Sequence, residues 1–296
     1  MSSKTPNTAA IIGAGIMGAA ITGRLLSVGF DVAVYNRDQD KLKPLTKLGA
    51  VAAATPAEAA ARASFVVVCL TYSDVVEEAV FGKDGVVQSA SAEKLLIDMS
   101  SIDPDATKRM AERLGRETGM GWIDCPLSGG APGAQSGTLT VMAGGSAEDF
   151  ERGRTVMDHL CANYNHMGPT GAGQATKLIN QLFCGLLFQG VAEAVVLAEA
   201  AGIDPSKVPA ALKGGRGDSR ILQEYMGKFA ARDHTPTGRL DNMMKDLETL
   251  QSFAVKTRTP LPLTTAVADI HRILIRMGLG SADMSEMIRL LEQKGD

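Results

Sequence analysis

The sequence predicts an α/β protein in which a doubly wound, mostly parallel sheet is followed by an all-helical domain. Three observations support this prediction. Short apolar runs alternate with helical segments over the first half of the chain, strand-like runs cease near Gly171, and 296 residues are enough for two domains with separate cores. We expect residues 1–168 to form the first domain and residues 169–296 the second.

The composition excludes several classes of protein. The chain has 30 Lys and Arg against 33 Asp and Glu, a net charge of −3, and only 4% aromatic residues. A nucleic-acid partner is therefore not expected, because it requires clustered cations and often stacking rings. No run of 18 apolar residues and no apolar core in the first ten residues is present, which predicts a cytoplasmic protein without a membrane partner.

The cysteines and histidines do not have the spacing of metal ligands. No CxxC pair occurs, and each cysteine lies in or beside an apolar stretch, which is typical of buried, reduced thiols. We therefore expect no metal site, and we expect the four histidines to have no functional role. The residues concerned are Cys69, Cys125, Cys161, Cys184, His159, His166, His234 and His271.

The strands of the first domain are predicted from runs that are apolar throughout. Four such runs occur, at residues 9–15, 31–37, 64–70 and 94–100, and residues 122–130 and 137–145 look like two further strands. Helix-type spacing over residues 17–28 and 56–62 separates some of them, and Thr55 with Pro56 is a typical helix start. Uniformly apolar strands joined by helices indicate a parallel sheet that is covered on both faces.

A long apolar helix is predicted at residues 175–201, ending at Gly202. Its apolar residues occupy most of its circumference, as expected of a helix covered by its own domain and by a neighbouring subunit, so we expect a homo-dimer or homo-tetramer. Five shorter helices are predicted after it, at residues 205–213, 219–230, 240–257, 262–277 and 283–294.

A glycine-rich turn after the first strand predicts a dinucleotide site of the Rossmann type. Gly13, Gly15 and Gly18 fit G-x-G-x-x-G, where the first glycine permits a tight turn and the second lets a pyrophosphate approach the backbone. The third allows close packing of helix and strand. The pyrophosphate then lies at a helix N-terminus, where free N–H groups favour negative charge.

The end of the second strand favours NADP(H) over NAD(H). An NAD site places an acidic residue there, roughly 20 residues after the glycines. This chain has Asn36 and Arg37 instead, which do not repel a 2′-phosphate and offer it a guanidinium. Asp38 and Asp40 follow closely, so NAD(H) stays an alternative.

Four motifs resemble those of the β-hydroxyacid dehydrogenase family, the 3-hydroxyisobutyrate dehydrogenase-like proteins, over nearly the whole chain. They are GAGIMG (13–18), DCPLSGGAPGAQSGTLTVMAGG (124–145), GAGQATKLINQ (171–181) and MMKDLETL (243–250). DMSSIDP (98–104) and PLPLTTAV (260–267) are most similar to the reductases of 2-hydroxy-3-oxopropionate, or tartronate semialdehyde, within that family. The resemblance implies a Rossmann domain, a helical domain, and hydride transfer between NADP(H) and a short β-hydroxy acid or its semialdehyde.

Lys177 is the candidate proton carrier. It lies on the helix that opens the second domain, and a protonated lysine stabilises and then neutralises the negative oxygen left by carbonyl reduction. Asn180 is three residues on, hence on the same helix face, and is expected to donate a hydrogen bond to a substrate oxygen. Gln181 follows where many family members have a second Asn, so its role is open.

The remaining site residues are divided between cofactor and substrate. Ser128, Gly129 and Gly130 offer a hydroxyl and approachable N–H groups to a carboxylate, a role that the resemblance also implies. From its position after the third strand, Leu70 is expected to line the cofactor channel. The resemblance further implies cofactor contacts for Ile16, Met17, Ser101 and Lys245, and a substrate contact for Asp246.

One segment departs from the pattern of the family. Residues 214–222 contain Arg216, Asp218 and Arg220 where relatives have mostly apolar or small residues, which indicates either a polar substrate tail or a charged loop. Two other functions stay open. One is an imine reductase, in which Asp or Tyr typically replaces Lys177, and the other is a non-catalytic NADP-binding protein.

Overall fold

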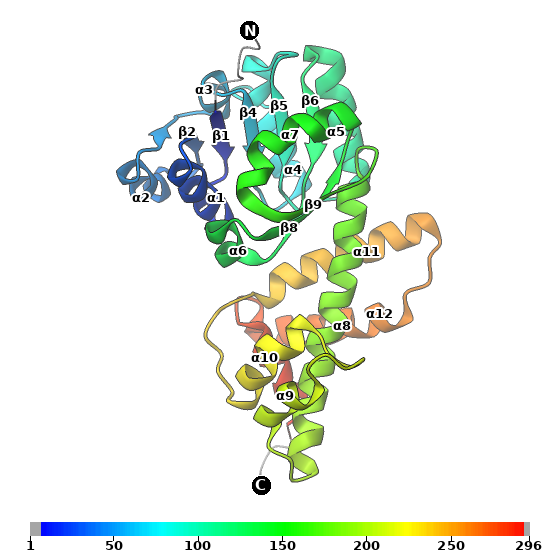
Figure 1. The fold of residues 1–296 in the computed structure, drawn as a ribbon. Helices are drawn as coiled ribbons and strands as arrows, with labels where there is room; N and C mark the ends of the chain where they lie inside the picture. Colours follow the sequence, from blue (N-terminus) through cyan, green and yellow to red (C-terminus); the bar gives the residue numbers. More distant parts are fainter. Residues whose placement is uncertain (1–6, 293–296) are drawn as a thin grey trace. The chain divides into compact units, whose positions relative to one another are not determined.

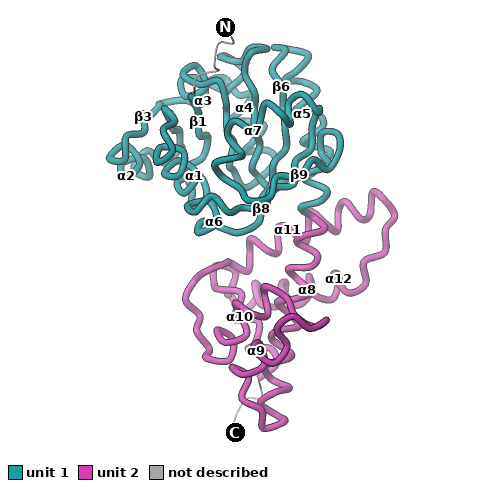
Figure 2. The backbone as a smooth tube through the Cα atoms, viewed as in Figure 1, with its two compact units in different colours: residues 1–177 teal, residues 178–296 magenta. Residues whose placement is uncertain are grey.

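The computed structural model describes residues 7–292, and residues 293–294 of the last predicted helix lie outside them. The chain divides into two compact units, Met1–Lys177 and Leu178–Asp296 (Figure 2). The division falls inside helix α8 (Ala172–Ala200), because the first turn of α8 is hydrogen-bonded to strands of the first unit. Each unit is described by itself.

Unit 1 contains a Rossmann-like sheet, as predicted (Figure 1). Its first six strands are all parallel and lie in the order β3-β2-β1-β4-β5-β6, which is the doubly wound arrangement with a switch point between β1 and β4. Their bounds are β1 Thr8–Ile12, β2 Asp31–Tyr35, β3 Val51–Ala52, β4 Phe65–Val68, β5 Leu95–Asp98 and β6 Gly121–Asp124.

The far edge of the sheet differs from the prediction. The run at residues 122–130 is divided into β6 and β7 (Leu127–Ser128), because Pro126 interrupts it and has no N–H to donate. Strand β8 (Leu139–Gly144) was predicted and pairs antiparallel with β6 and β7. Strand β9 (Cys161–Gly168) was not predicted, since it is a largely exposed edge strand with neither an apolar run nor alternation.

The helices of unit 1 cover both faces of the sheet. They are α1 Ile16–Ser27, α2 Lys43–Lys47, α3 Pro56–Ala61, α4 Ser73–Phe81, α5 Pro104–Thr118, α6 Gly130–Ser136 and α7 Ala147–Leu160, with short 3-10 helices at Gln39–Leu42 and Val86–Ser89. The predicted start of α3 is confirmed, because Thr55 Oγ1 accepts a hydrogen bond of 3.0 Å from the Glu58 N–H.

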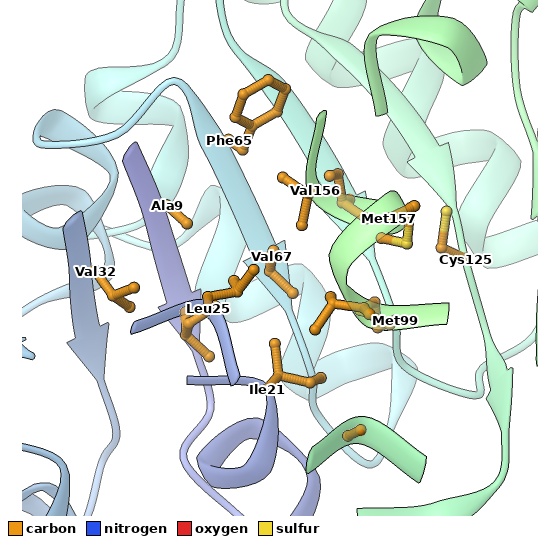
Figure 3. Close-up of a cluster of buried hydrophobic side chains, with 14 of the residues drawn as sticks. Ala9, Ile21, Leu25, Val32, Phe65, Val67, Met99, Cys125, Val156 and Met157 are labelled. Atoms are coloured by element: carbon orange, nitrogen blue, oxygen red, sulfur yellow. The ribbon is translucent and has the colours of Figure 1, made fainter. Parts of the chain in front are cut away.

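Two hydrophobic clusters lie on opposite faces of this sheet. On one face, Ala9 and Ile11 of β1 pack with α1 and α7, and Figure 3 shows Ile21, Leu25 and Val156 pointing toward the strands. The alternate residues of β1, Ala10 and Ile12, belong to the second cluster, which contains residues of α4 and α5. Burial on both faces explains why these strands are apolar throughout.

Unit 2 is helical, as predicted. It contains the greater part of α8, then α9 Val208–Leu212, α10 Arg220–Ala230, α11 Leu240–Thr257 and α12 Pro262–Leu274, with 3-10 helices at Pro205–Lys207 and Met284–Leu290. The last two predicted helices differ in detail. Helix α12 ends at Leu274 and passes into a π turn in which Gly278 has φ +88°, and the final segment is a 3-10 helix.

Helix α8 has 29 residues and is, by length and composition alone, apolar enough to cross a membrane. Its sequence did not suggest this, because charged residues such as Glu193 interrupt the apolar run. Buried helices of water-soluble proteins have the same property. Phe188, Val191 and Val195 of α8 pack in the hydrophobic core of unit 2.

Candidate active site

The glycine turn lies at the switch point of the sheet, between the carboxyl ends of β1 and β4. Gly13 has φ +106°, and a Cβ atom there would collide with the backbone of Cys69 and with the Leu70 side chain. A Cβ atom on Gly18 would collide with the carbonyl of Gly13. The first and third glycines are therefore required by the packing of the turn itself, as the sequence predicted.

Gly15, in contrast, faces open space. It is the N-cap of α1, no heavy atom lies within 4 Å of the position of an added Cβ, and no side chain caps the helix. The first turn of α1 contains no acidic residue that would repel a phosphate. Of the two predicted cofactor contacts in this turn, Ile16 is exposed and Met17 is half-buried. An open, uncapped N-terminus of a 12-residue helix fits the pyrophosphate of a dinucleotide. Backbone N–H groups of this turn would hold it.

The end of β2 is connected to this turn. Asn36 Oδ1 accepts a hydrogen bond of 3.0 Å from the Ala14 N–H, so Asn36 holds the glycine turn against β2. Arg37, the next residue, is exposed. The two carboxylates that follow have local partners. Asp38 caps the 3-10 helix through the Asp40 N–H, and Asp40 lies 2.7 Å from Lys43 Nζ.

Ser100 joins the ends of β4 and β5. Its Oγ accepts a hydrogen bond of 3.0 Å from the Leu70 N–H, and its own N–H donates to Asp98 Oδ1 at 3.0 Å. Leu70 is thereby held beside Gly13. That it lines the cofactor channel stays a prediction. The predicted Ser101 is the next residue and is half-buried. Sequence reasoning missed Ser100.

The start of α8 is hydrogen-bonded to the sheet through Asp124, at the end of β6. Asp124 Oδ1 accepts from the Gly171 N–H at 2.7 Å, and Oδ2 accepts from the Gln174 N–H at 2.9 Å. The Gln174 side chain then donates to Ser100 O at 2.9 Å and accepts from the Ile102 N–H at 3.1 Å. Lys177, which is 8% exposed, follows one turn later.

Asp98 and Asp124 form a pair of buried carboxylates in neighbouring strands. They stand opposite each other in the β5–β6 register, and both side chains are fully buried. Burial raises the pKa of Asp98 to about 7, with a further contribution from Asp124. Burial likewise raises the pKa of Asp124 to about 6, against the opposing effect of the N–H groups that it accepts. Each of these aspartates is the last residue of an apolar strand. This pattern is the sequence signal that could have identified Asp98 and Asp124.

Ser128, Gly129 and Gly130 lie where β7 passes into α6. Gly129 has φ +119° and Gly130 has φ +62°, so this turn needs glycine for its backbone conformation. The nearest neighbour of an added Cβ on Gly129 is Leu139 Cδ2, at 3.4 Å. Helix α6 packs against α1, so this turn and the glycine turn belong to adjacent helices.

The predicted site residues of unit 2 form one hydrogen-bonded chain between α8 and α11. Lys245 Nζ lies 2.9 Å from Asp246 Oδ1, and Gln181 Nε2 donates to Asp246 Oδ2 at 2.5 Å. Asn180 Nδ2 donates to Gln181 Oε1 at 2.8 Å. Lys245 and Asp246 are each less than one-fifth exposed, so they are not an ordinary surface pair.

The charged residues of segment 214–222 contact one another and their own helix. Asp218 accepts from the Gly214 N–H at 2.8 Å and from Gln223 Nε2 at 2.7 Å. Arg220 donates to Glu224 one turn later in α10. These local contacts are those of a charged loop that leads into a helix. All four cysteines are free thiols, and no group of three possible metal ligands occurs within residues 7–292.

Two family descriptions match the chain in the order of its units. Residues 8–168 match the NAD-binding domain of 6-phosphogluconate dehydrogenase, and residues 171–291 match the NAD-binding domain of NADP-dependent 3-hydroxyisobutyrate dehydrogenase. The chain belongs to the 3-hydroxyisobutyrate dehydrogenase-like β-hydroxyacid dehydrogenases. It is an NAD(P)-dependent oxidoreductase of that family.

Relatives that are named for different substrates have similar sequence identity to this chain. The chain is 32% identical to 2-(hydroxymethyl)glutarate dehydrogenase of Eubacterium barkeri, covering 95% of this chain and 94% of that one. It is also 32% identical to 2-hydroxy-3-oxopropionate reductase of Escherichia coli K12, covering 95% and 96%. The crystal structure of 3-hydroxyisobutyrate dehydrogenase from Salmonella typhimurium superposes with a TM-score of 0.85 at 29% identity, covering 96% and 99%.

Imine reductases share the fold at greater distance. An imine reductase from a Pseudomonas species superposes with a TM-score of 0.61 at 19% identity, over 98% of this chain and 100% of that chain. This likeness concerns the fold alone.

The glycine turn gives a paired test of cofactor binding. We expect Gly18→Ala to destabilise unit 1 by about 2 kcal/mol or more, because the new methyl group collides with the carbonyl of Gly13. Gly15→Ala should leave the unfolding free energy within about 1 kcal/mol but weaken NADPH binding at least tenfold, because the methyl group fills the open space beside the turn.

Chemical denaturation and fluorescence titration with NADPH measure the two effects. Equal NADPH affinity of Gly15→Ala and the wild type would contradict the assignment of the pyrophosphate to this turn.

Proposed function

We propose that the protein is an NADP-preferring oxidoreductase that interconverts a short β-hydroxy acid and its semialdehyde, such as tartronate semialdehyde or 3-hydroxyisobutyrate. The observation that carries this proposal is the anchored start of α8. Asp124 and Gln174 hold its first turn at the ends of β5 and β6, and Lys177 follows directly. A lysine held in this way at the carboxyl edge of the parallel sheet, where dinucleotides bind in this fold, is proposed to serve the nicotinamide end of the cofactor.

In the proposed reaction Lys177 acts as general acid in reduction and general base in oxidation. The nicotinamide supplies or accepts the hydride at the substrate carbon. Lys177 stabilises the negative charge that develops on the carbonyl oxygen and donates its proton, so that the aldehyde becomes a hydroxyl group. The lysine then regains a proton from solvent. Ser128, Gly129 and Gly130 are proposed to bind the substrate carboxylate through the hydroxyl and the backbone N–H groups.

The surroundings of Arg37 support the preference for NADP(H). Arg37 is exposed directly after β2, and within residues 7–292 it has no ion pair. Asp38 and Asp40, which an NAD ribose would need, lie within 4.0 Å and 2.7 Å of Lys41 and Lys43. An exposed guanidinium beside two carboxylates that have lysine partners favours a 2′-phosphate.

We also propose a cytoplasmic homo-oligomer. Ile179, Phe183 and Leu197 of α8 are each more than half exposed, which is unusual for large apolar side chains on one helix. A second copy of the chain covering part of this surface accounts for their exposure. Sedimentation velocity tests this proposal, and a concentration-independent monomer would reject it.

The role of Lys177 is tested by two substitutions. Lys177→Ala should lower kcat on the preferred semialdehyde by about 10²-fold or more while NADPH still binds, because both the charge and the transferable proton are lost. Lys177→Arg keeps the charge but cannot release a proton near neutral pH, and it should recover only a small part of the lost rate.

Steady-state NADPH oxidation with semialdehydes, α-keto acids and cyclic imines provides the measurement. Unchanged turnover in Lys177→Ala would exclude the assigned role, and activity on imines alone would favour an imine reductase.

The cofactor preference is tested at Arg37. Arg37→Ala should lower kcat/KM for NADPH by about tenfold or more and leave kcat/KM for NADH nearly unchanged, because only NADPH has the 2′-phosphate. Arg62→Ala, which removes an exposed arginine at the end of α3, is the matched control and should change neither value. A wild-type protein that uses NADH better than NADPH would contradict the proposal.

A further inference from the structure

We propose that Gln174 is a positioning residue for the cofactor, because its buried amide fixes the backbone on both sides of Ser101. The side chain thus has a role in NADP(H) binding in addition to anchoring α8. This inference rests on the proposed function in one respect, since the helix to which Ser101 is tied carries the proposed proton carrier, Lys177. Every residue that holds Ser101 in this way belongs to unit 1.

The Gln174 side chain uses both ends of its amide on one short loop, residues 99–102. Nε2 donates to Ser100 O at 2.9 Å, and Oε1 accepts from the Ile102 N–H at 3.1 Å. These two backbone groups belong to the peptide before Ser101 and to the peptide after it. A single side chain therefore fixes the position of Ser101, the residue for which the family resemblance implies a cofactor contact.

Burial makes these two hydrogen bonds hard to replace. Gln174 is 1% exposed, Ser100 2% and Ile102 3%, so water has little access to any of them. Without the amide, a buried carbonyl and a buried N–H lose their partners, which costs more than the loss of a hydrogen bond at the surface. The loop can satisfy these groups only by moving, and Ser101 moves with it.

The same loop is attached to the strands beside the glycine turn. Ser100 Oγ accepts from the Leu70 N–H at 3.0 Å, and the Ser100 N–H donates to Asp98 Oδ1 at 3.0 Å. Leu70 Cδ2 would lie 2.8 Å from a Cβ atom on Gly13. The loop is thus connected on one side to the proposed pyrophosphate site and on the other, through Gln174, to α8.

The loop requires an amide at position 174. Ser100 O only accepts and the Ile102 N–H only donates, so the side chain must offer one donor and one acceptor next to each other. A glutamine does this in one orientation. A glutamate does so only when it is protonated, because an ionised carboxylate has no hydrogen to donate to Ser100 O.

Gln174→Met tests the role in cofactor binding, since it nearly keeps the volume of the side chain and removes both hydrogen bonds. The Kd for NADP+ should rise about tenfold or more, because Ser101 is no longer held in place. Isothermal titration calorimetry with NADP+ measures this effect without any substrate. Gln189→Met is the matched control. It removes a buried glutamine further along α8 that donates to Glu193, and it should leave the Kd within about twofold of the wild type.

Ser101→Ala shows whether Gln174 acts through Ser101. This substitution should raise the Kd for NADP+ about fivefold, because a polar contact with the cofactor is lost. The double variant Ser101→Ala/Gln174→Met should bind NADP+ within about twofold of the weaker single variant, since the contact that Gln174 supports is already absent. Effects that multiply would overturn the inference.

Gln174→Glu gives a readout that a space-filling role would not change. At about pH 5.5 the buried glutamic acid is protonated and can make both hydrogen bonds, so the Kd for NADP+ should lie within about threefold of the wild type. At about pH 8.5 it ionises, and the ratio of the two Kd values should rise to about tenfold or more.

The wild type at the same pH is the reference for this ratio, because other groups near position 174 also titrate. Asp124 accepts from the Gln174 N–H, Asp98 stands opposite Asp124 in the sheet, and Lys177 lies one turn further along α8. Lys108 of α5 lies against Gly171. All four are present in both proteins, so a change in the ratio reports on position 174.

Failure of the inference and failure of the proposed function give different results. Wild-type NADP+ affinity in Gln174→Met, an equal loss in Gln189→Met, or a tenfold weaker Gln174→Glu at both pH values would overturn the inference and leave the proposed function standing. Wild-type turnover in Lys177→Ala, or no oxidation of any β-hydroxy acid, would overturn the proposed function without changing the NADP+ affinities expected here.

Discussion

The two hydrogen bonds that Asp124 accepts from the Gly171 N–H, just before α8, and from the Gln174 N–H, in its first turn, are the constraint on which the rest of the site depends. Helix α8 carries Lys177 in its second turn, so the place where the helix begins decides where this side chain lies. The Gly171 and Gln174 N–H groups are bound by one buried carboxylate at the end of β6. Gln174 adds a second connection, to the backbone after β5. Lys177, the proposed proton carrier, is thereby positioned by the sheet.

This anchor has a cost in stability. The pKa of Asp124 is raised from 3.8 to about 6 and that of Asp98 from 3.8 to about 7. Because these folded-state pKa values exceed the unfolded ones, the two carboxyl groups contribute most to the free energy of unfolding below about pH 4, where both are protonated. This contribution is lost as the pH rises through 6 and 7. Neutral pH thus places negative charge in the interior of unit 1. For Asp124, the N–H groups at the start of α8 offset part of this penalty.

Local patterns predicted most of the fold and part of the site. The apolar strands, the glycine turn and α8 each have a signal within a few residues, and the structure contains all three. The break at Pro126 lies inside a run that was predicted as a single strand. Edge strand β9 lacks a local signal of this kind. The same applies to Ser100, Gln174 and the Gln181–Asp246 bond, since each joins residues far apart in sequence whose neighbours only the folded chain reveals.

The most direct test of this account is the kcat of Asp124→Asn beside that of Asp98→Asn. The two aspartates stand in register on neighbouring strands, but only Asp124 accepts hydrogen bonds from α8. An asparagine at position 124 turns an NH2 group toward one of two N–H donors, which displaces the first turn of the helix. We predict a loss of about 10²-fold in kcat for Asp124→Asn and of less than about tenfold for Asp98→Asn. Wild-type kcat in Asp124→Asn would contradict the account.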